Sequence, residues 1–137
     1  MVDSRFSNAQ IQQDAATKAT PKRVLVMDNE RIVADTLAAI LRNAGYEVCA
    51  CFDELNALAY CESFRPDVMI TDVVMPGING IQTAIQVRQR YPACKILLFA
   101  GHAASAGLLE EARRNGFEFE TLQKASHPSV LLARIAS

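Results

Sequence analysis

The sequence predicts an α/β fold, a doubly wound parallel sheet of five strands with helices on both faces. Two observations carry that prediction. Short apolar runs, each followed by turn residues, recur along the chain with room for one helix between them. The segments between these runs carry apolar residues at helical spacing. Strands that alternate with helices and short loops are typical of a parallel sheet covered on both sides.

The composition is that of an ordinary soluble globular chain. Its 137 residues are enough for one domain with a substantial core, and half of them are apolar. The formal net charge of -1 offers no basic surface to nucleic acid or to an anionic membrane. No apolar run approaches the roughly 20 residues that span a bilayer, and the first residues lack a secretory signal. We therefore expect a cytoplasmic protein.

The chain divides into two parts of different composition. Residues 1–22 are rich in Gln, Ala, Ser, Thr and Asp and contain few large apolar side chains. We expect them to form a flexible polar leader, with a docking or dimerising arm as the alternative. Residues 23–137 carry the regular pattern and are expected to form one domain.

Five segments have the pattern of strands. The first and third are continuous apolar runs, each ending in an aspartate, Asp28 and Asp72. The last alternates aromatic and apolar with polar residues, which indicates an edge position. The strands are expected at residues 23–28, 46–52, 66–72, 95–100 and 117–123.

Five segments have the pattern of helices. Asp53 is the expected N-cap of the second, Pro92 ends the third, and Pro128 suits the first turn of the last. The helices are expected at residues 31–44, 54–63, 79–91, 103–115 and 129–136. The inward positions of the first are expected to be Ile32, Val33, Leu37, Ile40 and Leu41.

Four cysteines, Cys49, Cys51, Cys61 and Cys94, form no Cys-x-x-Cys pair. Cys49 and Cys51 have strand spacing and share one face. We expect buried or half-buried free thiols in a reducing compartment, and the pattern does not support a zinc site or a disulfide.

Two acids and a lysine stand at the expected ends of strands. The strand order 2-1-3-4-5, called flavodoxin-like, is the commonest for this count and places Asp28 beside Asp72 at the topological switch point. Lys124 ends the fifth strand and reaches the same place. Two carboxylates suit Mg²⁺, and a lysine suits a phosphoryl group. The alternative is that each aspartate only caps the turn that follows it.

These residues resemble the receiver domain of bacterial two-component response regulators. The resemblance covers about residues 23–137, a receiver-like domain. It is carried by the run at residues 26–30, by Asp72 with the Met-Pro-Gly at residues 75–77 and Gly80, and by Lys124.

The resemblance implies specific roles for these residues. Asp72 would be the phosphoacceptor, phosphorylated by a histidine kinase or phosphotransfer partner. Asp28 and the backbone carbonyl of Val74 would help to hold Mg²⁺, and Lys124 would contact the phosphoryl group. It implies a signalling module, with no enzymatic activity beyond phosphoryl transfer onto Asp72 and its hydrolysis.

One departure from the family pattern concerns the metal. The family usually has a second acid where this chain has Asn29. An amide oxygen can ligate Mg²⁺ but carries no charge, so the affinity is expected to fall. Glu30, the next residue, is interpreted as a helix-start residue favoured by the helix dipole, not as a substitute ligand.

Other departures concern the switch. Ala100 stands where the family has Ser or Thr, whose hydroxyl bonds the phosphoryl oxygen, and His102 and Ser105 lie nearby in sequence. Thr121 stands where many members have a switching aromatic residue. Ala125 replaces the usual proline after the lysine, and a non-proline cis peptide costs about 3 kcal/mol.

The resemblance also implies a face for a downstream protein or a homodimer, formed by the fourth helix, fifth strand and fifth helix. In this chain that face would include Arg113, Arg114, Thr121 and Arg134.

Three functions follow as hypotheses. The first is a phosphoacceptor receiver domain that signals by a changed protein-binding surface. The second is a degenerate pseudo-receiver that binds its partner without phosphorylation, which Asn29, Ala100 and Thr121 favour. The third is a flavodoxin-like cofactor binder. The chain lacks a Gly-x-Gly-x-x-Gly turn and a P-loop, which argues against the third.

Overall fold

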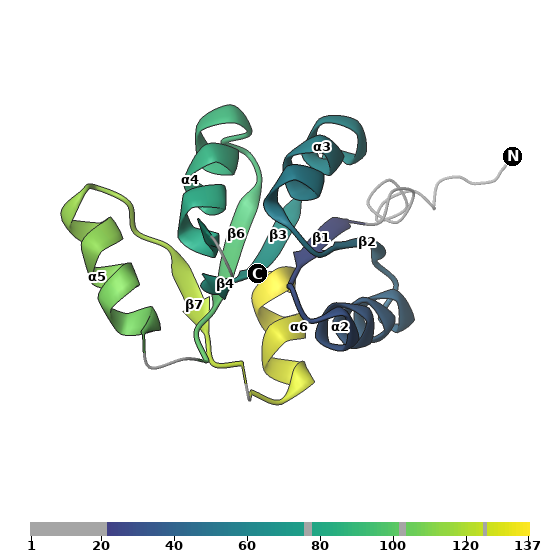
Figure 1. Ribbon diagram of the computed structural model, residues 1–137. Coiled ribbons are helices and arrows are strands. Elements are labelled where there is room, and N and C mark those ends of the chain that lie inside the picture. Colours follow the sequence, from purple (N-terminus) through teal and green to yellow (C-terminus); the bar gives the residue numbers. More distant parts are fainter. Residues whose placement is uncertain (1–21, 76–77, 102–103, 125) are drawn as a thin grey trace, which may run out of the picture.

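The computed structural model describes residues 22–75, 78–101, 104–124 and 126–137 (Figure 1). Within these residues, five parallel strands form one sheet in the order β2-β1-β3-β6-β7. The strands are β1 (Arg23–Met27), β2 (Glu47–Cys51), β3 (Val68–Asp72), β6 (Lys95–Phe99) and β7 (Glu120–Leu122). The predicted order 2-1-3-4-5 is confirmed, because β6 and β7 are the fourth and fifth strands of this sheet.

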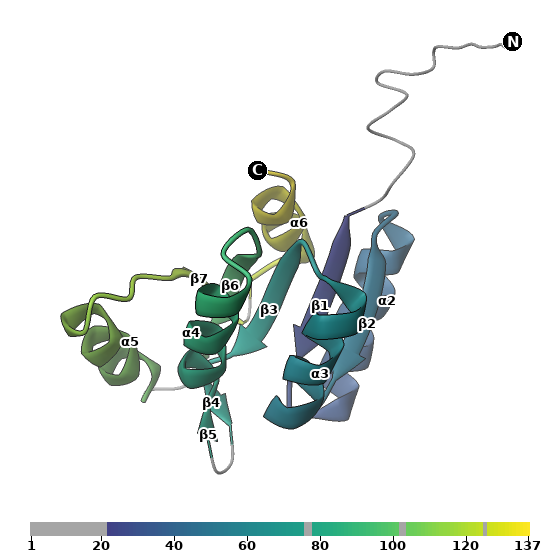
Figure 2. The same ribbon diagram turned by 90° about the horizontal axis from the view of Figure 1, so that it is seen from above.

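Helices cover both faces of the sheet, as Figures 1 and 2 show. On one face lie α2 (Arg31–Asn43) and α6 (Pro128–Ala136), and on the other lie α3 (Glu54–Phe64), α4 (Gly80–Arg90) and α5 (Ser105–Arg114). Successive strand residues point to opposite faces, so each strand feeds two cores. In β3, Met69 packs towards α3 and α4, whereas Ile70 packs towards α2 and α6.

The strand β3 occupies the centre of the sheet. It pairs with β1 on one side and with β6 on the other, and all five of its residues are buried. A continuous apolar run is the sequence signature of such a strand. Its position fixes Asp72, the last residue of β3, at the middle of the sheet's carboxyl edge.

The stripe that α2 buries includes Leu41, as predicted, but excludes Ile32. Ala34, Ala38 and Leu41 face the sheet, whereas Ile32 is 81% exposed. Ile32 and Ala34 are about 200° apart around the helix, so both cannot face the sheet. The prediction that Ile32 points inward is therefore wrong, although Leu37 does pack against this core.

The edge strand β7 is shorter than the predicted strand at residues 117–123. Phe117 and Phe119 leave the ladder and pack against the core beneath α4 and α5. The guanidinium carbon of Arg88, in α4, lies 4.2 Å from the centroid of the Phe119 ring. Its Nη1 donates a hydrogen bond of 2.8 Å to the carbonyl of Glu118. The side chain of Arg88 thus takes a carbonyl that strand pairing would otherwise use.

A two-stranded antiparallel hairpin follows Asp72, and no sequence pattern predicted it. It consists of β4 (Val74–Met75) and β5 (Ile78–Asn79). The helix α4 begins directly after it, and the N–H of Gly80 donates to the carbonyl of Val73 at 2.7 Å. The hairpin therefore returns the chain to the end of β3, where α4 begins.

The cysteines lie on the face covered by α3, as free thiols. Cys51, Cys61 and Cys94 are buried and Cys49 is half-buried, in agreement with the prediction. Burial is the main cause that raises the pKa of Cys51 and of Cys94 to about 12. Thiols with such pKa values are poor nucleophiles at neutral pH.

No helix among the described residues is both long enough and apolar enough to cross a membrane.

Gly80 is predicted to tolerate no side chain. A Cβ atom built on it would lie 1.8 Å from the carbonyl oxygen of Asp72. We expect Gly80→Ala to lower the free energy of unfolding by at least about 2 kcal/mol, because the start of α4 must move away from β3. Urea denaturation measures the change.

Gly107→Ala is the matched control within α5. A Cβ atom at Gly107 meets nothing within 4 Å, so this substitution should raise the free energy of unfolding by up to about 1 kcal/mol through helix propensity. Equal effects of the two substitutions would contradict the close approach at Gly80.

Candidate functional site

Asp72 ends β3 with its side chain almost fully buried, at 2% exposure. Its Oδ2 accepts a hydrogen bond of 2.8 Å from the Nζ of Lys124. Its Oδ1 is buried and has no hydrogen-bond partner among the described residues. A buried carboxylate oxygen without a donor is costly, so this atom marks a place where a positive group is missing.

Asp28 follows β1 and is 1% exposed. Its backbone N–H donates to the carbonyl of Cys51, which continues the pairing with β2 by one bond. Its Oδ1 accepts a hydrogen bond of 2.9 Å from the N–H of Glu30. Its Oδ2 lies 3.0 Å from the Nζ of Lys124 as an ion pair that lacks hydrogen-bond geometry. The two aspartates that the sequence places at strand ends therefore meet.

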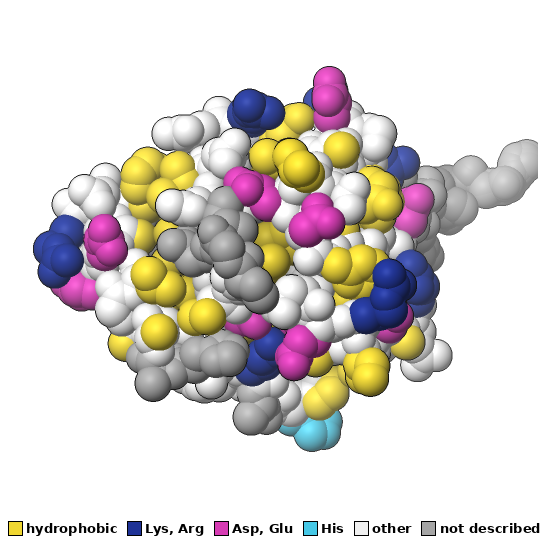
Figure 3. All heavy atoms as spheres, viewed as in Figure 1, with side chains coloured by type: hydrophobic (Ala, Val, Ile, Leu, Met, Phe, Trp, Pro, Cys, Tyr) yellow, Lys and Arg dark blue, Asp and Glu magenta, His cyan; other side chains and the backbone are white. Residues whose placement is uncertain are grey.

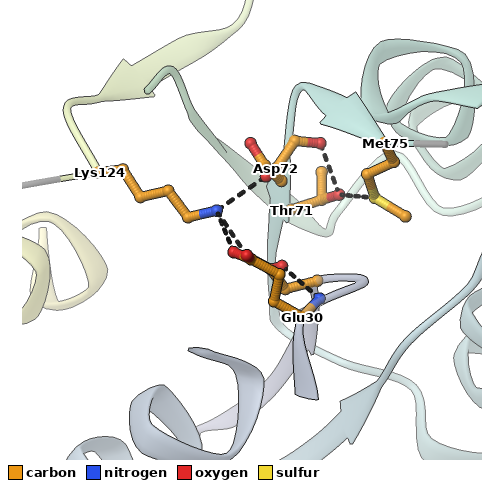
Figure 4. A network of polar contacts seen from close by, with 6 residues as sticks. Glu30, Thr71, Asp72, Met75 and Lys124 are labelled. Carbon is orange, nitrogen blue, oxygen red and sulfur yellow. Dashed lines mark hydrogen bonds and ion pairs between the residues drawn. The ribbon is translucent and has the colours of Figure 1, made fainter. Parts of the chain in front are cut away.

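Lys124 stands two residues after β7 and points between the two carboxylates (Figure 4). Burial lowers the pKa of its ammonium group, but the hydrogen bond to Asp72, the close contact with Asp28 and the negative charges of both carboxylates raise it more, and the net pKa lies above the ordinary value of 10.5. Gly101 makes room for the lysine chain, since a Cβ atom there would lie 3.0 Å from the Cβ of Lys124. The side chain of Lys124 therefore carries a positive charge at neutral pH.

Comparison with known proteins identifies the family of this chain. The family model of the response regulator receiver domain matches residues 24–136. The chain belongs to this family. A response regulator receiver protein of Anaeromyxobacter sp. (strain Fw109-5) is 35% identical over 95 residues, which are 69% of this chain and 40% of that protein. The chain therefore spans about two fifths of the length of this relative.

Solved receiver structures share the fold. The chemotaxis protein CheY4 of Vibrio cholerae is 28% identical, with a TM-score of 0.75 over 85% of this chain and 98% of that one. The response regulator TrrA of Thermotoga maritima, solved in complex with Mg²⁺ and BeF, is 27% identical. Its TM-score is 0.72 over 84% of this chain and 96% of that one.

The receiver site has the charge and the ligand chemistry for a divalent cation. Two buried carboxylates face one ammonium group, which leaves a net charge of about -1 at the centre of the site. Asp72 Oδ1 and Asp28 Oδ2 accept no hydrogen bond among the described residues. Oxygen atoms of this kind are what Mg²⁺ accepts, with water completing its shell. The residues present therefore fit the ion that receiver domains bind.

The sequence also predicts two further ligands of the metal, Val74 and Asn29, which follow the ends of β3 and β1. Val74, whose carbonyl the family resemblance selects, is in β4, in register with Asn79. Asn29 lies in the exposed bend between Asp28 and α2. Their roles as ligands stay predictions.

Two of the residues named from the sequence for the switch, Ala100 and Ser105, lie near the carboxyl end of β6. Ala100 follows β6, and its N–H donates to the carbonyl of Leu122 at 2.9 Å, but its methyl group offers no hydroxyl. Ser105 is 2% exposed, and its hydroxyl has no hydrogen-bond partner among the described residues. His102 and Ala125 lie outside the described residues, so the expectations for them stay predictions.

The predicted output face carries charges that are partly paired. Arg113 forms an ion pair with Glu110 within α5, and Arg134 of α6 lies 2.9 Å from Glu120 of β7. Arg134 also donates to the carbonyl of Thr121 at 3.3 Å. Arg114 is exposed. Figure 3, which views the carboxyl edge of the sheet, likewise shows basic and acidic side chains intermixed with hydrophobic ones.

Two contributions to the site escaped the sequence analysis. Thr71 is fully buried, and its hydroxyl donates to the backbone carbonyl of Asp72 at 3.1 Å. Glu30 Oε1 lies 3.8 Å from the Nζ of Lys124, and its side chain makes no capping bond to α2. The interpretation of Glu30 as a helix-start residue is therefore incomplete. In the sequence, the only sign that the Glu30 side chain lies near Lys124 is that Glu30 follows Asp28 by two residues.

Lys124→Gln is predicted to destabilise the domain at neutral pH. Removing the ammonium group leaves two buried carboxylates without their counter-ion, and we expect a loss of about 1–3 kcal/mol in the free energy of unfolding. Glutamine keeps most of the chain length, so the loss reports mainly on the charge. Urea denaturation of both proteins measures it.

The difference in unfolding free energy between the wild type and Lys124→Gln is predicted to depend on pH. Because the pKa of Lys124 in the folded state lies above 10.5, protonation of this group favours folding. Its contribution is fully present below pH 10.5 and is lost as the pH rises through the raised pKa. The stability difference between the two proteins should therefore be constant from neutral pH to about pH 10 and shrink above it. A difference that grows above pH 10.5 would contradict this assignment.

Proposed function

We propose that this receiver domain is phosphorylated on Asp72 by a histidine kinase or a phosphotransfer protein and signals through a changed protein-binding surface. The observation that carries the proposal is the unpartnered Oδ1 of Asp72 beside an Oδ2 that Lys124 already holds. One oxygen is thus oriented by a hydrogen bond, and the other is left without a donor to block it.

The reaction that this geometry supports is an in-line displacement at phosphorus. Asp72 Oδ1 attacks the phosphorus atom of the donor and forms the new P–O bond. The bond from phosphorus to the donor nitrogen, in a phosphohistidine, breaks and leaves its electron pair on the imidazole. No oxidant or further reactant is needed. Lys124 stands 2.8 Å from Oδ2 and can turn its remaining N–H groups to the phosphoryl oxygens.

Mg²⁺, when bound, neutralises charge on the phosphoryl group as it approaches the carboxylate. Asp28 and Asp72 would hold it, with the Val74 carbonyl and the amide of Asn29 as further ligands. Asn29 contributes no charge, so we expect a lower affinity than an acid would give. Asp28 is kept in place for this task by the N–H of Glu30.

The partners of the domain follow from the same proposal. A histidine kinase or phosphotransfer protein would approach the carboxyl edge of the sheet, where Asp72 lies. A downstream protein or a second copy would use the face formed by α5, β7 and α6, which correspond to the fourth helix, fifth strand and fifth helix of the sequence analysis. We expect the protein to work in the cytoplasm and to have no membrane or nucleic-acid partner through this domain.

Incubation with acetyl phosphate and Mg²⁺ is predicted to add one phosphoryl group to the protein. Intact mass spectrometry at mildly acidic pH detects the product, and hydroxylamine should remove the added mass because it cleaves acyl phosphates. Asp72→Asn should abolish the addition. Asp35→Asn, which removes an exposed acid from α2, should leave it unchanged. Labelling that persists in Asp72→Asn would contradict the assignment of the phosphoacceptor.

The second candidate is a pseudo-receiver that binds its partner without phosphorylation. Ala100 and Thr121 favour it, because a phosphoryl group shifts a conformational equilibrium only through contacts that differ between the two states. In that case beryllofluoride with Mg²⁺ would change amide NMR signals around Asp72 and leave those of α5 and β7 unchanged. Shifts that extend to α5 and β7 would instead support the phosphorylation switch.

A further inference from the structure

Glu30 caps α2 by position but not by its side chain. Its backbone is extended, as at an N-cap, and its carboxylate accepts no hydrogen bond from the helix. No other acidic residue lies in the first turn of α2. The carboxylate instead points towards Lys124, the lysine that also contacts Asp72, with Oε1 3.8 Å from its Nζ (Figure 4).

The backbone of Glu30 joins it to the same pair. Its N–H donates to Asp28 Oδ1 at 2.9 Å, so the residue that orients Asp28 also carries the neighbouring charge. Asn29, between them, has no charge to contribute. Asp72 Oδ1 has no hydrogen-bond partner among the described residues, and Asp28 Oδ2 has only the ion pair with Lys124, so both oxygens suit a cation.

Glu30 does not stand where it could ligate a metal together with the aspartates. Within the ranges that the structure describes, no three acidic, histidine or cysteine side chains are grouped closely enough to hold a metal ion. The side chain of Glu30 is also 65% exposed. It can therefore act on the cation site by its charge and through Lys124, as a positioning residue.

A divalent cation bound to both aspartates would repel the ammonium group of Lys124 and favour its movement away from them. Among the described residues, Glu30 is the remaining carboxylate within 4.0 Å of its ammonium group. If the ammonium group moves away from the aspartates, the Glu30 carboxylate, 3.8 Å away, can pair with it. The free energy needed to displace Lys124 is then lower than it would be beside a neutral side chain.

We propose that Glu30 supplies, from one position further along the chain, the negative charge that Asn29 lacks, and so sets the affinity of the Asp28–Asp72 pair for a divalent cation. The inference rests on the proposed function, because it concerns the same cation site.

A double-mutant cycle in the whole chain tests the proposal with Mg²⁺ as the ligand. The proteins are the wild type, E30Q, N29D and N29D/E30Q, titrated with Mg²⁺ at constant ionic strength and followed by amide NMR shifts. We expect E30Q to weaken Mg²⁺ binding about three- to tenfold, since an exposed charge acts through solvent. In the N29D background the same substitution should weaken binding less than about twofold, because the charge is already restored.

Glu62→Gln is the matched control. Glu62 is an exposed acid near the end of α3, and that end lies at the opposite edge of the sheet from Asp72. Its loss changes the net charge equally and should leave the affinity unchanged. If Glu62→Gln lowers the Mg²⁺ affinity as much as E30Q does, the effect of E30Q comes from net charge alone, and the proposal is overturned.

The remaining outcomes separate this inference from the proposed function. If the wild type binds Mg²⁺ and is phosphorylated, two results overturn only the role of Glu30. One is that E30Q weakens Mg²⁺ binding equally in the wild-type and N29D backgrounds, and the other is that E30Q does not weaken it in the wild-type background. A wild type that neither binds Mg²⁺ nor accepts a phosphoryl group overturns the proposed function and this inference together.

Discussion

Two buried carboxylates share one ammonium group at the carboxyl edge of the sheet, and much of the nearby structure serves to hold them there. The parallel pairing of β1 with β3 brings Asp28 next to Asp72. The edge strand β7 delivers Lys124 from the far side of β6. Gly80 and Gly101 leave the space that the backbone of Asp72 and the chain of Lys124 occupy. A folded chain keeps such an arrangement at a cost in stability, because one positive charge does not satisfy two buried negative ones.

The same imbalance is what the proposed function uses. If the site were neutral and all its oxygens were hydrogen-bonded, it would not attract a cation, and it would have no carboxylate oxygen available to attack phosphorus. Here Asp72 Oδ1 is left open while Oδ2 is held by Lys124. The charge near this pair, including that of Glu30, then decides how strongly a cation binds. In the proposed function, Ala100 and Thr121 would bear on a later step, the response of the rest of the domain to phosphorylation.

Much of the fold and the three central residues were predictable from the sequence for a physical reason. A central parallel strand is buried on both faces, so it appears as an uninterrupted apolar run, and the acid that ends the run is conspicuous. What failed depends on contacts between distant residues. Arg88 bonding the carbonyl of Glu118, and Phe119 under that arginine, shorten β7 in a way that no local pattern shows. The position of the Glu30 side chain likewise depends on Lys124, which is far away in sequence.

Lys124 is the built-in counter-ion of both aspartates. Titration of the lysine side-chain ammonium groups by ¹⁵N NMR tests it directly, with Lys124→Gln to assign the signal. We expect the pKa of Lys124 to lie above 10.5, and Asp72→Asn to move it down towards that value because one of the two negative charges is removed. A Lys124 pKa at the ordinary value that does not respond to Asp72→Asn would show that the lysine is not the counter-ion of the aspartates.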